Sequence, residues 1–203
     1  MSQKAAVIVG LSTSNMWLKH HEDMFSSQNY GNYLPELWMQ VRDVVLTEYG
    51  NGVSFDPLTE ALKRKNDEEG WVIMTHDMDG LAEKAGIDPL VEMRGNVFKG
   101  RCLRCQTVMD IGIDDFEKLA DGEVFSCVKC GKPRVRPDIV LPGERMKHRR
   151  LVRDWMKDLG VVICVDRDSI HPDCQKLLEE VSTVKFVKRD EISDWIADGL
   201  QIF

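Results

Sequence analysis

The sequence predicts an α/β fold built on a doubly wound parallel sheet, together with a separate zinc ribbon. Short apolar runs rich in valine and isoleucine alternate with helical patterns, which is typical of strands and crossover helices in a parallel sheet. Two Cys-x-x-Cys pairs interrupt this alternation near the middle of the chain. The chain has 203 residues, of which 43% are hydrophobic, and this suits one globular unit of one or two lobes.

The two cysteine pairs are the most specific motif of the sequence. In each pair two residues separate the cysteines, a spacing that lets four thiolates surround one tetrahedral zinc ion. Gly131, directly after the second pair, suits a tight turn with positive φ. The alternative is that the four thiols are free or disulfide-bonded. We expect a structural Zn²⁺ site with no position left open for catalysis, and its ligands are Cys102, Cys105, Cys127 and Cys130.

Composition and charge argue against several classes of function. A net charge of −7 argues against nucleic acid as a partner. The basic run at 145–153 is interpreted as the solvated face of an amphipathic helix. No apolar stretch approaches the roughly 18 residues that cross a membrane, so no membrane partner is expected. No signal peptide is recognised, and the cysteine usage, which includes Cys164 and Cys174 as buried thiols, fits a reducing cytoplasm.

The chain opens with an expected strand at residues 5–9, an apolar run that ends at Gly10. The small polar loop 10–15 follows it, at the place where a doubly wound fold can hold a nucleotide phosphate. A strand-to-loop turn without a ligand is the alternative. The next segment has no clear period, and one polar cluster in it is interpreted as a solvated loop rather than a metal site: His20, His21, Glu22 and Asp23.

Two helices and a second strand follow this loop. Residues 34–49 carry apolar side chains at helical spacing. Pro57 opens a second helix, which we expect to give way to a charged exit at 63–70. Residues 71–74 form a second buried strand.

A polar loop, residues 75–80, leaves the carboxyl end of the second strand and leads into a helix at 81–85. Ligands in open α/β sheets bind outside the carboxyl ends of the strands, so this loop is the best candidate for a site. The alternative is a capping loop, in which Asp77 or Asp79 binds the free amides of the following helix.

The remaining elements continue the alternation of strands and helices. We expect strands at 90–93, 161–165 and 184–187, and a strand at 135–141 that returns to the sheet. One or two helical turns are expected at 114–120, and helices at 145–159, 172–181 and 190–199.

Four pieces of the sequence, in this order, resemble motifs of the sirtuin (Sir2) family. Thr-His-Asp-Met-Asp-Gly-Leu at 75–81, with Ala85-Gly86 behind it, resembles the family's Thr-Gln-Asn-Ile-Asp-x-Leu and Ala-Gly. Met93-Arg94-Gly95 resembles its His-Gly, and the cysteine pairs resemble its zinc ribbon. Arg-Pro-Asp-Ile-Val-Leu-Pro-Gly-Glu at 136–144 resembles Arg-Pro-x-Val-Val-x-Phe-Gly-Glu.

The resemblance implies a Rossmann-like NAD-binding lobe and a small lobe made of the zinc ribbon and helices. NAD and an acyl-lysine protein or peptide would bind between the lobes, and the family activity is NAD-dependent protein-lysine deacylation. By this resemblance the Rossmann-like lobe comprises residues 1–15, 66–95 and 135–203. The small lobe comprises residues 16–65 and 96–134.

Matching positions also carry over the family's site residues. The resemblance places three residues at catalytic positions: Arg94 at the histidine, Asp77 at the asparagine and His76 at the glutamine. The implied cofactor-binding residues are Gly10, Ser12, Ser14, Thr75, His76, Asp77 and Asp79. The implied substrate-binding residues are Ile139, Val140, Gly143 and Glu144.

Several of these positions depart from the family pattern. The guanidinium of Arg94 stays protonated and cannot serve as the general base that the family's histidine provides. Asp77 exchanges an amide for a negative charge, and we hypothesise an ion pair between it and Arg94. Ser12 replaces a glycine, and Asp166 with Asp168 would repel a pyrophosphate.

The sequence is therefore compatible with three functions. The first is the family's deacylation, with His76 as the only displaced base. The second is NAD hydrolysis or ADP-ribosyl transfer, which needs oxocarbenium stabilisation more than a base. The third is a non-catalytic nucleotide-binding or protein-interaction module.

Overall fold

The structure is a computed structural model that describes residues 6–10, 23–49, 52, 54–159, 161–181, 183–188 and 190–191. It contains a five-stranded sheet in the order β3-β2-β1-β7-β8, and every neighbouring pair in it is parallel. The strands are β1 (Ala6–Val9), β2 (Val72–Thr75), β3 (Leu90–Glu92), β7 (Val162–Val165) and β8 (Val184–Val187). The predicted doubly wound parallel sheet is confirmed.

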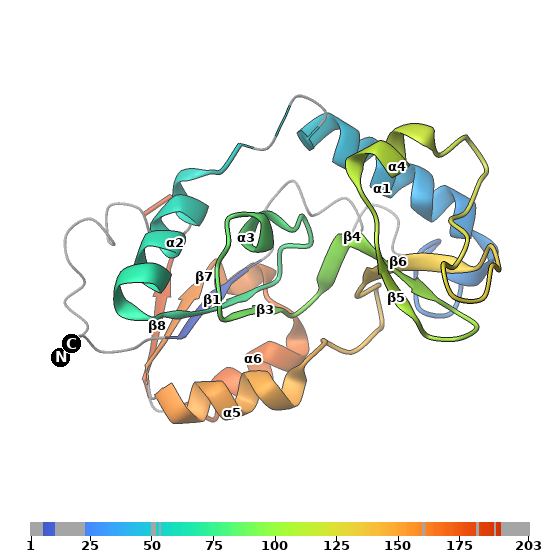
Figure 1. Ribbon diagram of the computed structural model, residues 1–203. Helices are drawn as coiled ribbons and strands as arrows, with labels where there is room; N and C mark the ends of the chain where they lie inside the picture. The colour runs from blue at the N-terminus through green and yellow to red at the C-terminus, as the bar shows by residue number, and fades with distance from the viewer. Residues whose placement is uncertain are drawn as a thin grey trace.

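Alternate residues of each central strand face opposite layers of helices. Val7, Ile73 and Ile163 pack with α2 (Pro57–Glu69), while Ile8, Met74 and Cys164 pack with α5 (Arg149–Leu159) and α6 (Pro172–Leu178). Because successive strand residues point to opposite faces, a continuous apolar run is required when both faces are covered. Figure 1 shows α2 on one side of the sheet, and α5 and α6 on the other.

Helix α2 differs from its prediction in length and in position. Asp56 caps its first turn through Thr59 N–H at 2.6 Å, and Gly70 ends it in the left-handed conformation. The expected charged exit at 63–70 is therefore helical as far as Glu69, with Lys65 and Glu69 paired one turn apart. Its buried side chains join the parallel-sheet core rather than the small lobe, so we propose that the boundary between the lobes lies after α1.

The small lobe contains an antiparallel sheet in the order β5-β4-β6. Its strands are β4 (Gly95–Cys102), β5 (Val108–Asp110) and β6 (Val135–Ile139). The expectation that 135–141 returns to the parallel sheet is wrong, because β6 pairs with β4 and ends at Ile139.

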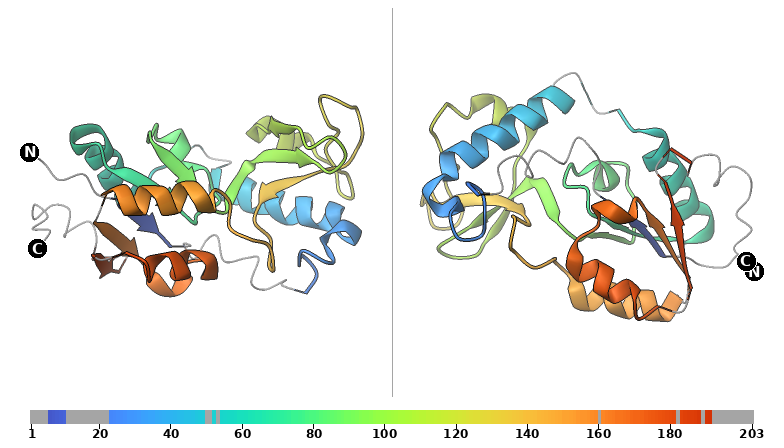
Figure 2. Two further views of the ribbon diagram at one scale, coloured as in Figure 1. Left: turned by 90° about the horizontal axis from the view of Figure 1, so that it is seen from below. Right: turned by 180° about the vertical axis from the view of Figure 1, so that it is seen from behind.

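Helices α1 (Leu34–Tyr49) and α4 (Ile113–Lys118) cover this small sheet. The indole of Trp38 donates a hydrogen bond to the Val135 carbonyl at 2.6 Å and packs edge-on against Phe125. Helix α1 begins and ends where its apolar spacing predicts. Figure 2 shows the two lobes lying end to end, with α1 beside the strands of the zinc ribbon.

Short elements complete the description: α3 (Leu81–Lys84) and the 3-10 turns η2 (Tyr30–Asn32) and η3 (Arg167–Ser169). The helix predicted at 172–181 ends at Leu178, and Asp23 lies in an exposed turn. His20, His21, Glu22 and most of the helix predicted at 190–199 lie outside the described residues.

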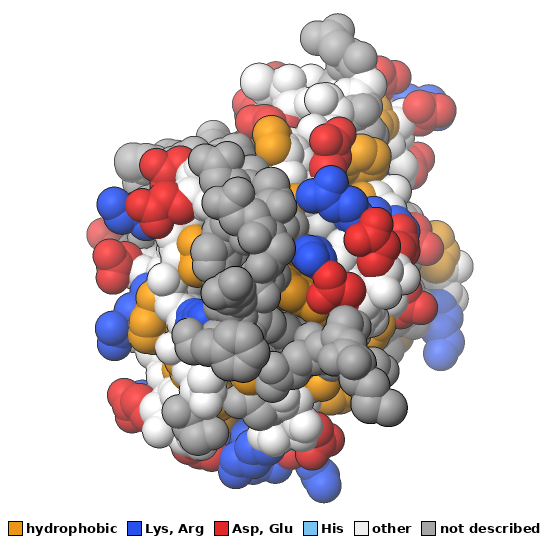
Figure 3. Space-filling model, turned by 90° about the vertical axis from the view of Figure 1, so that its left-hand side faces the viewer, with side chains coloured by type: hydrophobic (Ala, Val, Ile, Leu, Met, Phe, Trp, Pro, Cys, Tyr) orange, Lys and Arg blue, Asp and Glu red, His pale blue; other side chains and the backbone are white. Residues whose placement is uncertain are grey.

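The surface is charged and mixed. On α5 the first turn carries Arg149 and Arg150, and Val152 and Met156 are buried, so the amphipathic pattern is confirmed for these residues. Arg145 and Lys147 of the predicted basic face lie before the helix, where Lys147 pairs with Asp138 at 2.7 Å, and Leu151 is exposed rather than buried. On the face drawn in Figure 3, acidic and basic side chains lie side by side. Within the described ranges no helix has the length and apolar character needed to cross a membrane.

Candidate functional site

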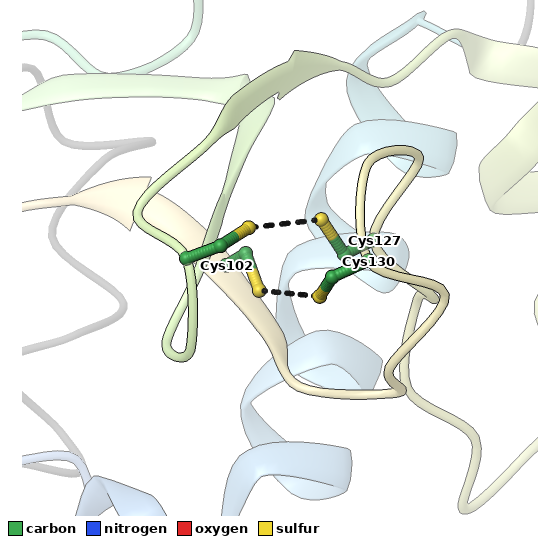
Figure 4. Close-up of side chains that lie close together, drawn as sticks. Cys102, Cys127 and Cys130 are labelled. Atoms are coloured by element: carbon green, nitrogen blue, oxygen red, sulfur yellow. Dashed lines mark hydrogen bonds between the residues drawn. The ribbon is translucent and has the colours of Figure 1, made fainter.

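The four predicted cysteines form one cluster at the tip of the small lobe. The Sγ atoms of Cys102 and Cys130 lie 3.7 Å apart, and those of Cys105 and Cys127 lie 3.6 Å apart. All four ligand atoms lie within 4.8 Å of one another. A Zn–S bond of about 2.3 Å implies a tetrahedron edge of about 3.8 Å, so the thiolates fit a zinc ion. Figure 4 shows the two knuckles facing each other across this space.

The backbone of each knuckle is arranged to support thiolates. Arg104 N–H points to Cys102 Sγ at 3.4 Å, and Lys129 N–H points to Cys127 Sγ at 3.4 Å. Gly131 has φ +65° and donates to the Cys127 carbonyl at 2.8 Å, as its place after the pair predicted. With four protein thiolates no coordination position remains for water, so the cluster is a structural zinc site.

The polar loop after β2 is fixed largely by hydrogen bonds to its own backbone. Thr75 Oγ1 accepts from Asp77 N–H at 2.9 Å, and Asp79 Oδ1 accepts from Leu81 N–H at 3.0 Å. The Tyr49 hydroxyl donates to the Asp79 carbonyl at 3.1 Å. The capping interpretation is therefore correct for Asp79, whose carboxylate binds a free amide at the start of α3.

His76, the second residue of this loop, is fully buried, with 0% of its surface exposed. Its Nδ1 lies 3.1 Å from the Val9 carbonyl. Since a carbonyl only accepts hydrogen bonds, Nδ1 carries the proton and Nε2 is left as a lone-pair acceptor. Nε2 has no hydrogen-bond partner among the described residues. Burial, reinforced by the charge of Arg94, lowers the pKa of His76 to about 3, so the ring is neutral.

Arg94 lies in the link between β3 and β4. Figure 1 shows that the chain passes from the parallel sheet to the small antiparallel sheet between these two strands. Its Nη2 donates to the Val140 carbonyl at 3.5 Å, and its buried Nε has no partner in the described part of the chain. Burial lowers the pKa of Arg94, and the charge of Asp77 acts in the opposite direction. The hypothesised contact ion pair between these two described side chains is not formed, so their interaction is a longer-range one.

A pocket of about 260 Å³ opens beside the loop. It is lined by Val9 and Thr75 at the strand ends, by apolar side chains of α2, and by four carboxylates: Glu48, Asp56, Asp77 and Asp79. No lysine or arginine is among its described lining residues.

Two glycines near the site are required by close backbone contacts. A Cβ at Gly10 would lie 2.3 Å from Ser169 Oγ and 2.5 Å from the Asp166 carbonyl, so the residue packs β1 against the turn after β7. Gly95 has φ +79°, and a Cβ there would lie 1.9 Å from the Asp138 carbonyl. The cofactor-binding positions predicted at Ser12 and Ser14 lie outside the described residues.

The segment predicted to bind substrate is held by internal contacts. Arg136 binds Glu144 through two hydrogen bonds, at 2.6 and 2.8 Å. Burial alone would raise the pKa of Glu144, but these bonds outweigh it and lower the pKa. Val140 N–H donates to the Arg94 carbonyl at 2.7 Å, and Ile139 pairs with Gly95 in the sheet.

A family model described as "Sir2 family" matches residues 10–167, more than half of the chain. The chain belongs to the Sir2 family. Among curated relatives, the NAD-dependent protein deacylase 2 of Archaeoglobus fulgidus is 36% identical over 81 residues, which cover 39% of this chain and 31% of the relative. The NAD-dependent protein deacylase of Helicobacter hepaticus is 28% identical over 105 residues, covering 52% and 39%. The matched region thus spans about a third of these relatives.

Solved Sir2 structures share the fold of this chain. A Sir2 homologue–NAD complex aligns with a TM-score of 0.74 at 14% identity, covering 96% of this chain and 88% of the other. A structure of Sir2Af2 bound to a myristoylated histone peptide aligns with a TM-score of 0.64 at 19% identity, covering 94% of this chain and 82% of the other. At this identity the likeness concerns the fold alone.

Sequence reasoning missed two contributors to the site of this Sir2-family chain. Helix α2, whose start at Pro57 was predicted, also lines the pocket through Leu58, Thr59 and Leu62, which its apolar spacing alone did not indicate. His171 interacts electrostatically with both Arg94 and His76, and its Nε2 lies 3.1 Å from the Glu144 carbonyl. A single histidine far along the chain carried no pattern that could have identified it.

Proposed function

We propose that this chain binds NAD between its lobes and is at most a slow acyl-lysine deacylase. The observation that carries the proposal is the side chain at the position of the family's catalytic histidine. Arg94 occupies it, and a guanidinium stays protonated at physiological pH even though burial lowers its pKa.

The neighbouring histidine does not replace the missing base. A pKa of about 3 makes His76 a weak proton acceptor at neutral pH, where a base with a pKa near the working pH is most effective. The one N–H group of its neutral ring donates a hydrogen bond to the Val9 carbonyl, so the ring is also fixed in place.

The acidic pocket supports the binding of the nicotinamide end of NAD. The nicotinamide ring of NAD carries a positive charge, and cleavage of its bond to ribose develops positive charge on the sugar. Asp77, Asp79 and Asp56 place negative charge at the pocket walls, which would stabilise both. This observation also favours NAD hydrolysis or ADP-ribosyl transfer as the second candidate function, because neither needs the ribose-activating base.

Zinc would be held by the four cysteines and would supply folding free energy to the small lobe. The zinc ribbon contributes no reacting group. Acyl-lysine proteins or peptides are the proposed second partner, by relation to the curated deacylases.

Calorimetric titration with NAD tests the binding proposal. We expect saturable binding that weakens in Asp77→Lys, because the substitution reverses a charge at the pocket wall. Asp114→Lys, at an exposed position of the small lobe, is the matched control and should bind as the wild type does. Absence of NAD binding by wild-type protein with its zinc in place would reject the proposal and favour an interaction module.

A further inference from the structure

Two buried polar atoms lack hydrogen-bond partners within the described residues, and both belong to the same small region. They are Arg94 Nε, which is a donor, and His76 Nε2, which is an acceptor. Buried polar groups are nearly always paired in folded proteins, so an unpaired donor and an unpaired acceptor together point to a missing partner.

The two side chains leave the carboxyl ends of adjacent strands. Strand β2 pairs in parallel with β3, with Thr75 opposite Glu92, and Met93 N–H donates to the Thr75 carbonyl at 2.8 Å. His76 follows Thr75 directly in the sequence, and Arg94 follows Met93 directly. The charge of Arg94 lowers the pKa of both His76 and His171, so Arg94 acts electrostatically on both rings.

Asp77 is the carboxylate whose charge acts on the pKa of Arg94, and three other buried or half-buried carboxylates of this part of the fold bind other groups. Asp138 binds Arg101 at 2.8 Å and Lys147 at 2.7 Å, and Glu144 binds Arg136. Asp173 accepts from Met146 N–H at 3.2 Å and lies 3.8 Å from His171. Asp77 is near enough to raise the pKa of Arg94 but makes no ion-pair contact with it.

We propose that Arg94 receives an oxyanion of the bound ligand, a carboxylate or a phosphate, while His76 Nε2 accepts a hydrogen bond from a neighbouring donor group of that ligand. This deepens the proposed function, on which it rests, by naming the chemistry of the group that enters between the lobes. A guanidinium binds carboxylate or phosphate through parallel hydrogen bonds, and a buried cation without an anion is costly.

The test compares ligands that differ only in charge. Binding is measured by fluorescence anisotropy for two labelled peptides of one sequence, one with acetyl-lysine and one with an acyl-lysine whose chain ends in a carboxylate. Inorganic phosphate is titrated as a competitor, so that a carboxylate source and a phosphate source give different results. We expect the carboxylate peptide to bind about 10- to 100-fold more tightly than the acetyl peptide, or phosphate to compete at millimolar concentration.

Three variants test whether Arg94 causes the preference for an anionic ligand. Arg94→Gln should lose the preference for the anion, while Arg94→Lys should retain part of it. Because Arg94→Gln removes a buried cation that has no contact anion, its melting temperature without ligand should equal or exceed that of the wild type. Arg134→Gln, at an exposed position of the zinc ribbon, is the control and should bind as the wild type does.

Equal affinity for both peptides without competition by phosphate would overturn the inference. So would an Arg94→Gln variant that melts earlier and keeps the preference, because Arg94 would then be structural. The NAD titration is independent: NAD binding without anion preference rejects only this inference, whereas anion preference without NAD binding rejects only the proposed function.

Discussion

His76 should make the protein sensitive to mild acid, and the size of the effect follows from its burial. Folding lowers the pKa of this histidine from 6.5 to about 3. Below pH 6.5 the imidazole of His76 binds a proton in the unfolded chain but not in the folded chain, so the free energy of unfolding decreases as the pH falls from about 6.5 towards 3. Each pH unit in this window costs about 1.4 kcal/mol, so the loss between pH 7 and pH 5 is about 2 kcal/mol.

The substitution His76→Gln should remove this dependence. Glutamine can still donate to the Val9 carbonyl but carries no titrating group. Urea unfolding at pH 7, 6 and 5 gives the free energy of unfolding of both proteins, and their difference isolates His76 from the other acid-sensitive groups. His148→Gln is the comparison: partial burial and the charge of Lys147 lower the pKa of His148 too, so this substitution should reduce the pH dependence in the same direction but by less than His76→Gln. Parallel pH profiles for wild type and His76→Gln would refute the reasoning, because His76 would then titrate as in the unfolded chain.

Three further substitutions test the fold. Cys102→Ser should release zinc, measured by elemental analysis, and unfold the small lobe, since in such modules binding energy is folding energy; full zinc retention would contradict a four-thiolate site. Glu144→Gln should lower the free energy of unfolding by about 3 kcal/mol, because Arg136 is left buried without its anion, whereas Glu117→Gln on the surface should cost little. Gly95→Ala should cost more than about 2 kcal/mol by thermal denaturation, since its Cβ would lie 1.9 Å from the Asp138 carbonyl; a wild-type melting temperature would show that this contact relaxes.

Much of the fold was predictable because its signals are local. The three central strands of the parallel sheet, β1, β2 and β7, are continuous buried runs rich in valine and isoleucine, which sheets covered on both faces require, and the zinc ligands are set by spacing alone. Helix α2 was predicted too short, because its residues after Lys63 are all polar or charged, including the buried Asn66, and show no apolar period. The pairing of β6 with β4 depends on a contact between distant segments, which no local pattern records.

The candidate site was predictable only in part. The loop at 75–80 could be placed because parallel strands present their carboxyl ends at one edge of the sheet. The pKa shifts of Arg94 and His76 could not be predicted. They are decided by burial and by the absence of a carboxylate in contact with Arg94, and these two features depend on how the chain packs. For the same reason the distance between Arg94 and Asp77 could not be predicted: the charge of Asp77 acts on Arg94, but the two described side chains form no contact ion pair.

The most direct test of the proposed function is nicotinamide release from NAD by the wild-type protein, with and without an acetyl-lysine peptide. Loss of a general base lowers rates by about 10²- to 10⁴-fold, so we expect peptide-dependent release at about 10⁻² s⁻¹ or less from a protein that binds NAD. Release without peptide would favour hydrolysis or ADP-ribosyl transfer over deacylation. Peptide-dependent turnover at about 1 s⁻¹ or more would contradict the account, because a working base would then be present, and His76→Ala would be expected to abolish it.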